Sequence, residues 1–183
     1  MTAPVKRDPL LKPDAATDHI LGPASAEVTV IEYGDFECPS CGQAHSAVKI
    51  MLDHFGPQLR FVFRHYPQRE IHPHAELAAE AAEAAGAQRM FWPFHDLLFA
   101  HQQQLQDKQL LDYAGDIGLD LPRYKAEMLD HVYLQRVQEH LAGAQHLGIR
   151  ATPTFYVNGA VTDASLGPQH LHQAIERALN AGR

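Results

Sequence analysis

Apolar positions in the first third of the chain follow two different periods. The run VTVIEY at 28–33 is short, β-branched and aromatic, which is typical of a buried strand. After the cysteines, apolar residues spaced three and four apart form one face of a helix that Gly56 and Pro57 end. LRFVF at 59–63 then returns to strand chemistry. The pattern predicts a strand, a helix and a strand, connected as a right-handed βαβ unit with parallel strands.

The strand pattern is absent between about residues 72 and 148. AELAAEAAEAAGAQ is rich in the best helix-forming residue, and the segments that follow it carry helical spacing. We expect several short helices here, with breaks at Gly86, Pro93, Gly118 and Pro122.

The strand pattern returns near the end of the chain. Asn158-Gly159 stands between two short apolar runs, which is the strongest short signal for a hairpin. Pro168 then opens a last helix, in which Leu171 and Ile175 share one face. The chain is thus expected to finish as strand, strand and helix.

These elements together predict an α/β fold in four parts. Residues 1–26 contain four prolines and neither period, so they are expected to form an extended arm before the folded body. A βαβ half at 27–70, a helical insertion at 71–148 and a ββα half at 149–183 follow.

Composition narrows the possible partners. A chain of 183 residues can bury a sizeable core without disulfides or metals, and 45% hydrophobic with 20% charged residues is ordinary for a globular protein. The formal net charge is −7 and lysine and arginine form no run, which argues against nucleic acid and anionic membranes as partners. No signal peptide and no apolar span of about 20 residues are recognisable, so we expect no membrane insertion. A cytoplasmic protein is expected, or an exported one if the chain is a processed form.

The candidate chemistry lies in DFECPSCGQAH, which holds the chain's two cysteines, Cys38 and Cys41. Cys38 precedes the predicted helix, and Pro39 takes the first helical position, where a missing N–H does no harm. The unpaired N–H groups of the first turn and the helix dipole then favour a thiolate at Cys38. Cys41, one turn further on, lies on the same side of the helix and can attack a mixed disulfide formed at Cys38.

Three other readings of the cysteine pair compete with a catalytic dithiol. A zinc site needs four ligands, so His45, His72 or His74 would have to complete it. A static disulfide across so short a loop would constrain the unfolded chain little. A cysteine hydrolase would gain nothing from a second cysteine at this spacing. We therefore assign no metal ligand and no cofactor.

The motifs taken together resemble a known family. The strand VTVIEYGDFE, the CPSC motif at 38–41 opening a helix, and Thr152-Pro153 entering a later strand are similar to the thioredoxin superfamily. From about 27 to 180 the chain resembles the DsbA-like branch more closely, in its soluble and antiporter-fused forms. The resemblance implies a thioredoxin fold with a helical insertion. It also implies a disulfide oxidoreductase that acts on protein or peptide thiols and disulfides and exchanges electrons with an unidentified redox partner.

The resemblance also assigns roles to residues. Cys38 matches the nucleophile and Cys41 the resolving thiol. Pro153 matches the cis-proline that faces the sulfurs, and Thr152 would offer backbone groups to an extended substrate. Glu32 matches a buried acid that assists proton transfer at the resolving thiol, and burial in an apolar strand should raise its pKa.

The sequence departs from the strongly oxidising members of the family at one position. Ser40 stands where those members carry histidine, and serine brings no cation, so we expect a less oxidising pair. Asp35, Glu37 and His65 are expected at the edge of the site, where Glu37 would oppose a thiolate. Two alternatives stay open: a non-catalytic redox-responsive or metal-binding module, and a relative of the glutathione-dependent isomerases and transferases.

Overall fold

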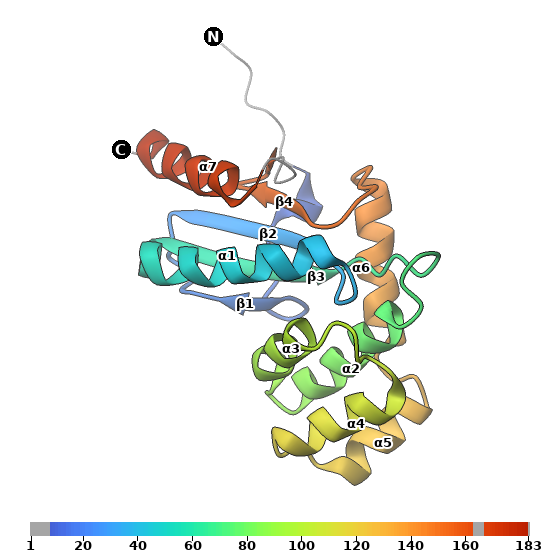
Figure 1. The fold of residues 1–183 in the computed structure, drawn as a ribbon. Helices are drawn as coiled ribbons and strands as arrows, with labels where there is room; N and C mark the ends of the chain where they lie inside the picture. Colours follow the sequence, from blue (N-terminus) through green and yellow to red (C-terminus); the bar gives the residue numbers. More distant parts are fainter. Residues whose placement is uncertain (1–7, 163–166, 183) are drawn as a thin grey trace. The chain divides into compact units, whose positions relative to one another are not determined.

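The computed structural model describes residues 8–162 and 167–182, and it confirms an α/β fold (Figure 1). The chain divides into two compact units. The first comprises residues 1–32, 47–64 and 154–183, and the second comprises residues 33–46 and 65–153. The helix α1 (Pro39–Phe55) begins in the second unit and ends in the first.

A five-stranded sheet organises the first unit. Its order is β1-β3-β2-β4-β5, so the two strands of the predicted βαβ segment are neighbours. All but one residue of β2 and of β3 are buried, including the polar residues Glu32, Arg64 and His65. The strands are β1 (His19–Leu21), β2 (Val28–Gly34), β3 (Leu59–His65), β4 (Thr154–Val157) and β5 (Ala160–Thr162).

The strand β1 corrects the prediction of an extended N-terminal arm. Residues 19–21 pair antiparallel with β3, so the prediction is wrong for them; residues 1–7 lie outside the described residues. Gly22 has φ +87°, and a Cβ there would lie 2.3 Å from the Leu59 carbonyl oxygen, so this close approach requires glycine. The buried Arg64 also binds both carboxylate oxygens of Asp18, at 2.7 and 2.8 Å. Pairing and this ion pair, neither visible in a three-residue pattern, hold the segment in the fold.

The end of the first unit follows the prediction. Asn158 and Gly159 have φ values of 48° and 83°, as a tight hairpin turn requires, and β4 pairs antiparallel with β5. The helix α7 (Pro168–Ala181) packs against both strands and buries Leu171, Ile175 and Leu179.

The second unit contains the predicted helices between residues 71 and 148. Its first helix, α2, packs against each of the four others. The break predicted at Gly86 falls one residue before the end of α2, and the chain turns at Arg89, where φ is 64°. The break predicted at Pro93 is wrong, because Pro93 lies in the first turn of α3 (Phe91–Ala100). The helices are α2 (Ala75–Ala87), α3 (Phe91–Ala100), α4 (Asp107–Asp116), α5 (Leu121–Leu129) and α6 (Leu134–His146).

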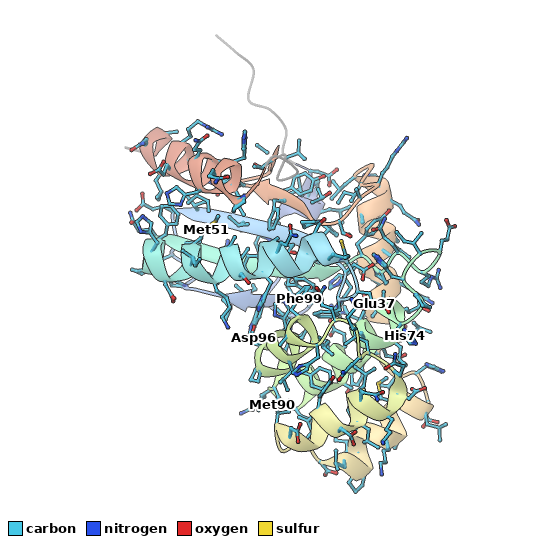
Figure 2. The ribbon with its side chains drawn as sticks, viewed as in Figure 1. Glu37, Met51, His74, Met90, Asp96 and Phe99 are labelled. Carbon is cyan, nitrogen blue, oxygen red and sulfur yellow. The ribbon has the colours of Figure 1, made fainter. Side chains whose placement is uncertain are left out.

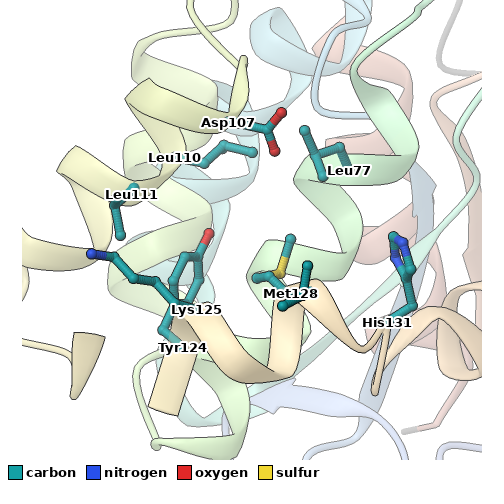
Figure 3. Close-up of a pocket in the computed structure, with 9 residues that line it drawn as sticks. Leu77, Asp107, Leu110, Leu111, Tyr124, Lys125, Met128 and His131 are labelled. Atoms are coloured by element: carbon teal, nitrogen blue, oxygen red, sulfur yellow. The ribbon is translucent and has the colours of Figure 1, made fainter. Parts of the chain in front are cut away.

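A mainly apolar pocket of about 370 Å³ lies among α2, α4 and α5 (Figure 3). Leu77, Leu110, Tyr124 and Met128 line it. Neither cysteine belongs to its lining, so the pocket is separate from the dithiol.

Candidate active site

The chain places Cys38 at the N-cap of α1. The Cys38 N–H donates to the Asp35 carbonyl at 3.2 Å, and the Cys38 carbonyl accepts the first helical hydrogen bond from the Gly42 N–H at 3.1 Å. The backbone N–H groups of Ser40 and Cys41 therefore reach the Cys38 sulfur. The first turn of the helix thus surrounds the sulfur with donors, as the sequence predicts.

These contacts change the acidity of Cys38. Its pKa is lowered from 9.0 to about 5, chiefly by a hydrogen bond from the Cys41 thiol. Burial opposes this shift, while the Thr152 side chain and the N–H groups of Cys41 and Ser40 add to it. A thiolate therefore predominates at neutral pH.

The two sulfurs differ in access. Cys38 is 6% exposed and Cys41 is completely buried, and both are free thiols. The Asp35 N–H donates to the Cys41 sulfur at 3.5 Å. Cys38 is therefore the sulfur that a substrate can reach first, and Cys41 is held behind it.

Thr152 and Pro153 lie beside this dithiol. Their peptide bond is cis, as the resemblance implies, and the Cys38 sulfur lies 3.4 Å from the Thr152 carbonyl oxygen, to which only the protonated form can donate. The Thr152 hydroxyl donates to the side-chain oxygen of Gln68 at 3.0 Å. The structure thus brings together residues more than a hundred positions apart in sequence.

Asp35 joins the cysteine loop to the segment after β3. Its buried carboxylate accepts the backbone N–H groups of Glu37 and Gln68, both at 2.8 Å. The same carboxylate lies 2.8 Å from Nδ1 of His72. Asp35 therefore uses its backbone to bind the Cys41 sulfur and its side chain to fix the neighbouring loop, which itself reaches Thr152 through Gln68.

Glu37 forms a second carboxylate–imidazole pair at the rim of the site. It accepts the His74 backbone N–H at 2.6 Å and lies 2.9 Å from His74 Nδ1, and both residues are labelled in Figure 2. The sequence suggested that Glu37 would oppose the thiolate by like-charge repulsion. The structure instead shows its carboxylate engaged by a histidine.

Gln102 was not anticipated from the sequence. Its side-chain N–H groups donate to the carbonyl oxygens of Phe36 and Cys38, both at 2.8 Å. A Cβ on Gly42 would lie only 2.2 Å from the Gln102 side-chain oxygen, so the glycine after the CPSC motif leaves room for this amide. That glycine was the one sequence signal for the contact.

The other predicted residues lie in varied surroundings. Glu32 is buried on β2, within the first unit, and its part in proton transfer stays a prediction. Pro39 and Ser40 are exposed at the start of α1. His65 is buried and lies 2.8 Å from the Glu83 carboxylate.

Comparison with known proteins agrees with this geometry. A family model described as "Thioredoxin" matches residues 14–177. The chain belongs to the thioredoxin family.

Curated relatives of this thioredoxin-family chain are named as antiporters. It is 45% identical over 176 residues to "Na(+)/H(+) antiporter NhaA 1" of Salinispora arenicola, covering 96% of this chain and 27% of that protein. It is 44% identical over 146 residues to "Na(+)/H(+) antiporter NhaA" of Herminiimonas arsenicoxydans, covering 80% and 23%. The chain thus spans about a quarter of the length of these relatives. Within the described parts of the chain, no helix combines the length and apolar character needed to cross a membrane.

Solved structures of thioredoxin-family proteins match most of the chain. Oxidised BdbD from Bacillus subtilis superimposes with a TM-score of 0.81 at 27% identity, over 92% of this chain and 96% of that one. A thioredoxin-like oxidoreductase from Silicibacter pomeroyi gives 0.79 at 29% identity, over 94% of both. The thiol-disulfide exchange protein α-DsbA2 from Wolbachia pipientis shares the fold, with 0.75 at 19% identity over 89% and 88%. The predicted resemblance to DsbA-like proteins is confirmed, and these neighbours support an oxidoreductase role in general.

Proposed function

We propose that this chain is a thiol-disulfide oxidoreductase that acts on protein dithiols and disulfides. One observation carries the proposal: the pKa of Cys38 is lowered to about 5 by the neighbouring Cys41 thiol, with help from helix N–H groups. An activated thiolate beside a buried second thiol is the arrangement that disulfide exchange requires. A purely structural dithiol does not require a lowered thiol pKa, whereas disulfide exchange does.

The exchange has two steps. The Cys38 thiolate attacks one sulfur of a substrate disulfide, that S–S bond breaks, and the other substrate sulfur leaves as a thiolate. Cys41 then loses its proton and attacks the Cys38 sulfur of the mixed disulfide, which releases the second substrate thiol. The substrate gains two electrons and the Cys38–Cys41 pair becomes a disulfide. The reverse sequence oxidises a substrate, and a dithiol or disulfide redox partner restores the starting state.

Thr152 has a place in the same proposal. Its backbone lies beside the Cys38 sulfur, next to the cis-Pro153. An extended substrate segment that pairs with the Thr152 backbone would have its own sulfur presented to Cys38. Gln68 holds the Thr152 hydroxyl, so that side chain is already oriented before substrate binds.

Glu32 is proposed to accept and return the proton of Cys41. Its burial on β2, at 2% exposure, supports this role. Glu32→Gln should slow the release of a trapped mixed disulfide while leaving the alkylation rate of Cys38 unchanged.

Reduction of insulin tests the function. With dithiothreitol as the electron source, the wild-type chain should accelerate insulin precipitation, and Cys38→Ser should do no better than buffer. Cys41→Ser should retain the first step and accumulate a mixed disulfide with insulin, visible on a non-reducing gel. Equal rates for the wild type and Cys38→Ser would refute the proposal.

A further inference from the structure

Three donor side chains converge between α1 and α3 within the second unit. His45 comes from α1, and His95 and Asp96 are consecutive residues of α3; their donor atoms all lie within 4.8 Å of one another. Figure 2 labels Asp96 and Phe99 on α3. None of the three belongs to the disulfide-exchange chemistry described above.

The distances in this cluster are long for charge-assisted hydrogen bonds and match the spacing of metal ligands. His45 Nε2 and His95 Nδ1 each lie 3.4 Å from the same oxygen of Asp96. A charge-assisted hydrogen bond would bring such atoms to about 2.7–2.9 Å. Zinc bonds of about 2.0–2.2 Å in a tetrahedron place neighbouring ligand atoms about 3.3–3.5 Å apart. Both observed separations match the edge of that tetrahedron.

The surroundings prepare the histidines to bind a cation. Phe99 stacks on His45 at 4.9 Å and meets the His95 ring edge-on at 4.9 Å, which fixes both ring planes. The Asp96 side chain is 43% exposed, so an ion can enter and water can supply a fourth ligand.

A second histidine cluster in the same unit shows the contrast. His65 Nε2 lies 2.8 Å from Glu83, and His140 Nδ1 accepts the His65 backbone N–H at 3.2 Å. All three residues are buried, and the short separation is that of a hydrogen bond. This cluster is held by a hydrogen bond of ordinary length, whereas the corresponding separations in the cluster of His45, His95 and Asp96 are 3.4 Å.

We propose that His45, His95 and Asp96 form a binding site for a zinc-class divalent transition-metal ion. His45 Nε2, His95 Nδ1 and the Asp96 carboxylate are three ligands, and water is the fourth. Two imidazoles and one carboxylate are a donor set that zinc accepts readily. The site shares His45 with the zinc alternative considered for the cysteines but includes neither cysteine, and His72 and His74 are held by Asp35 and Glu37.

The bound ion would link the two helices that support the dithiol. α1 begins directly after Cys38, and Gln102, just beyond α3, donates to the Cys38 carbonyl. The proposal does not depend on disulfide exchange, and a chain inactive toward insulin could still bind the ion.

Cobalt binding tests the site directly. The full chain carrying Cys38→Ser and Cys41→Ser removes the thiols as competing ligands, and titration with Co²⁺ should produce the intense visible bands of four-coordinate cobalt at one ion per chain. Zn²⁺ should abolish these bands by displacement. His45→Ala and Asp96→Asn, introduced separately into this background, should each weaken binding more than about tenfold, since even second-shell partners alter metal affinity by about 10- to 100-fold.

Matched controls separate a built site from scattered surface binding. His54→Ala removes an exposed histidine from the same helix as His45 and should leave cobalt affinity unchanged. Zn²⁺ should raise the melting temperature of the thiol-free chain but not of its Asp96→Asn variant, because only a folded-state ligand shifts unfolding. The proposal is overturned by an absence of four-coordinate bands in excess cobalt. Equal affinity in the thiol-free chain, His45→Ala and Asp96→Asn would overturn it as well.

Discussion

The ionisation of a single sulfur decides what Cys38 can do. Its lowered pKa of about 5 means that most chains carry a thiolate at pH 7. The ultraviolet absorbance of the thiolate should therefore rise with a midpoint near pH 5, and the rate of alkylation by iodoacetamide should follow the same curve. Cys41→Ser exchanges the thiol that contributes the largest share of this lowering for a hydroxyl, so it serves as the comparison and should move the midpoint. A wild-type midpoint above about 8 would contradict the structure.

Asp35 is a positioning residue, because its carboxylate accepts hydrogen bonds from two backbone N–H groups and contacts the His72 ring. Asp35→Asn keeps the shape but removes the charge that binds His72 and the Gln68 N–H, so we expect a loss of about 1–3 kcal/mol in the free energy of unfolding. Urea unfolding of the reduced protein measures it, and the alkylation curve of Cys38 shows whether the site itself shifts. Arg69→Ala is the control: its ion pair with Glu76 is exposed and should contribute less than about 1 kcal/mol. Equal losses in the two variants would show that the Asp35 contacts have no special weight.

The candidate site was predictable only where its chemistry is local. A helix start could be predicted from the four residues 38–41 alone. The backbone N–H groups of that first turn do reach the Cys38 sulfur. His72 binds Asp35 across 37 positions and Gln102 binds Cys38 across 64. No local period encodes such contacts, because they depend on how the helices of the second unit are placed.

Among the elements, the alanine-rich helix α2 has a role that only its packing reveals. The alanine-rich sequence predicts a helix from propensity, but propensity does not say whether that helix is buried or lies on the surface. In the structure α2 is instead surrounded by the other helices of its unit. Its buried alanines allow those helices to approach closely; they are Ala75, Ala78, Ala79, Ala81, Ala82, Ala84 and Ala85.

This packing makes α2 intolerant of larger side chains. Ala82 is completely buried, so Ala82→Leu should destabilise the protein by about 1–3 kcal/mol through overpacking. Ala87→Leu adds the same atoms at the exposed last residue of the helix and should change stability by less than about 0.5 kcal/mol. Thermal or urea unfolding compares the two. Similar stabilities would mean that the centre of the helical unit is not closely packed.

The prediction failed for a strand too short to show a period, and for a proline that was taken as the end of a helix. β1 has three residues, too few for a period, and exists because it pairs with β3. Pro93 was predicted as a helix break, yet it lies in the first turn of α3, where its missing N–H removes no helical hydrogen bond. The Asn158-Gly159 hairpin was predictable, because its turn demands left-handed residues whatever surrounds it.

At the scale of the whole molecule, the dithiol links redox state to folding. The pKa of Cys38 is lower in the folded protein than the ordinary value of 9.0 that the unfolded chain restores. The stability that the thiolate contributes is therefore complete above about pH 9 and is lost as the pH falls through about 5. The oxidised protein has no thiol at this position and lacks the contribution.

This linkage predicts how the two redox forms respond to pH. Between about pH 5 and 9, the free energy of unfolding of the reduced form should rise relative to that of the oxidised form, and at pH 4 this pH-dependent advantage should be gone. Urea unfolding of both forms across this range measures the difference, in which the titrations of other groups largely cancel. Cys38→Ser, treated with reductant, should lose the slope although Cys41 remains. If the free energies of unfolding of the reduced and oxidised wild type changed in parallel with pH, folding would not stabilise the Cys38 thiolate.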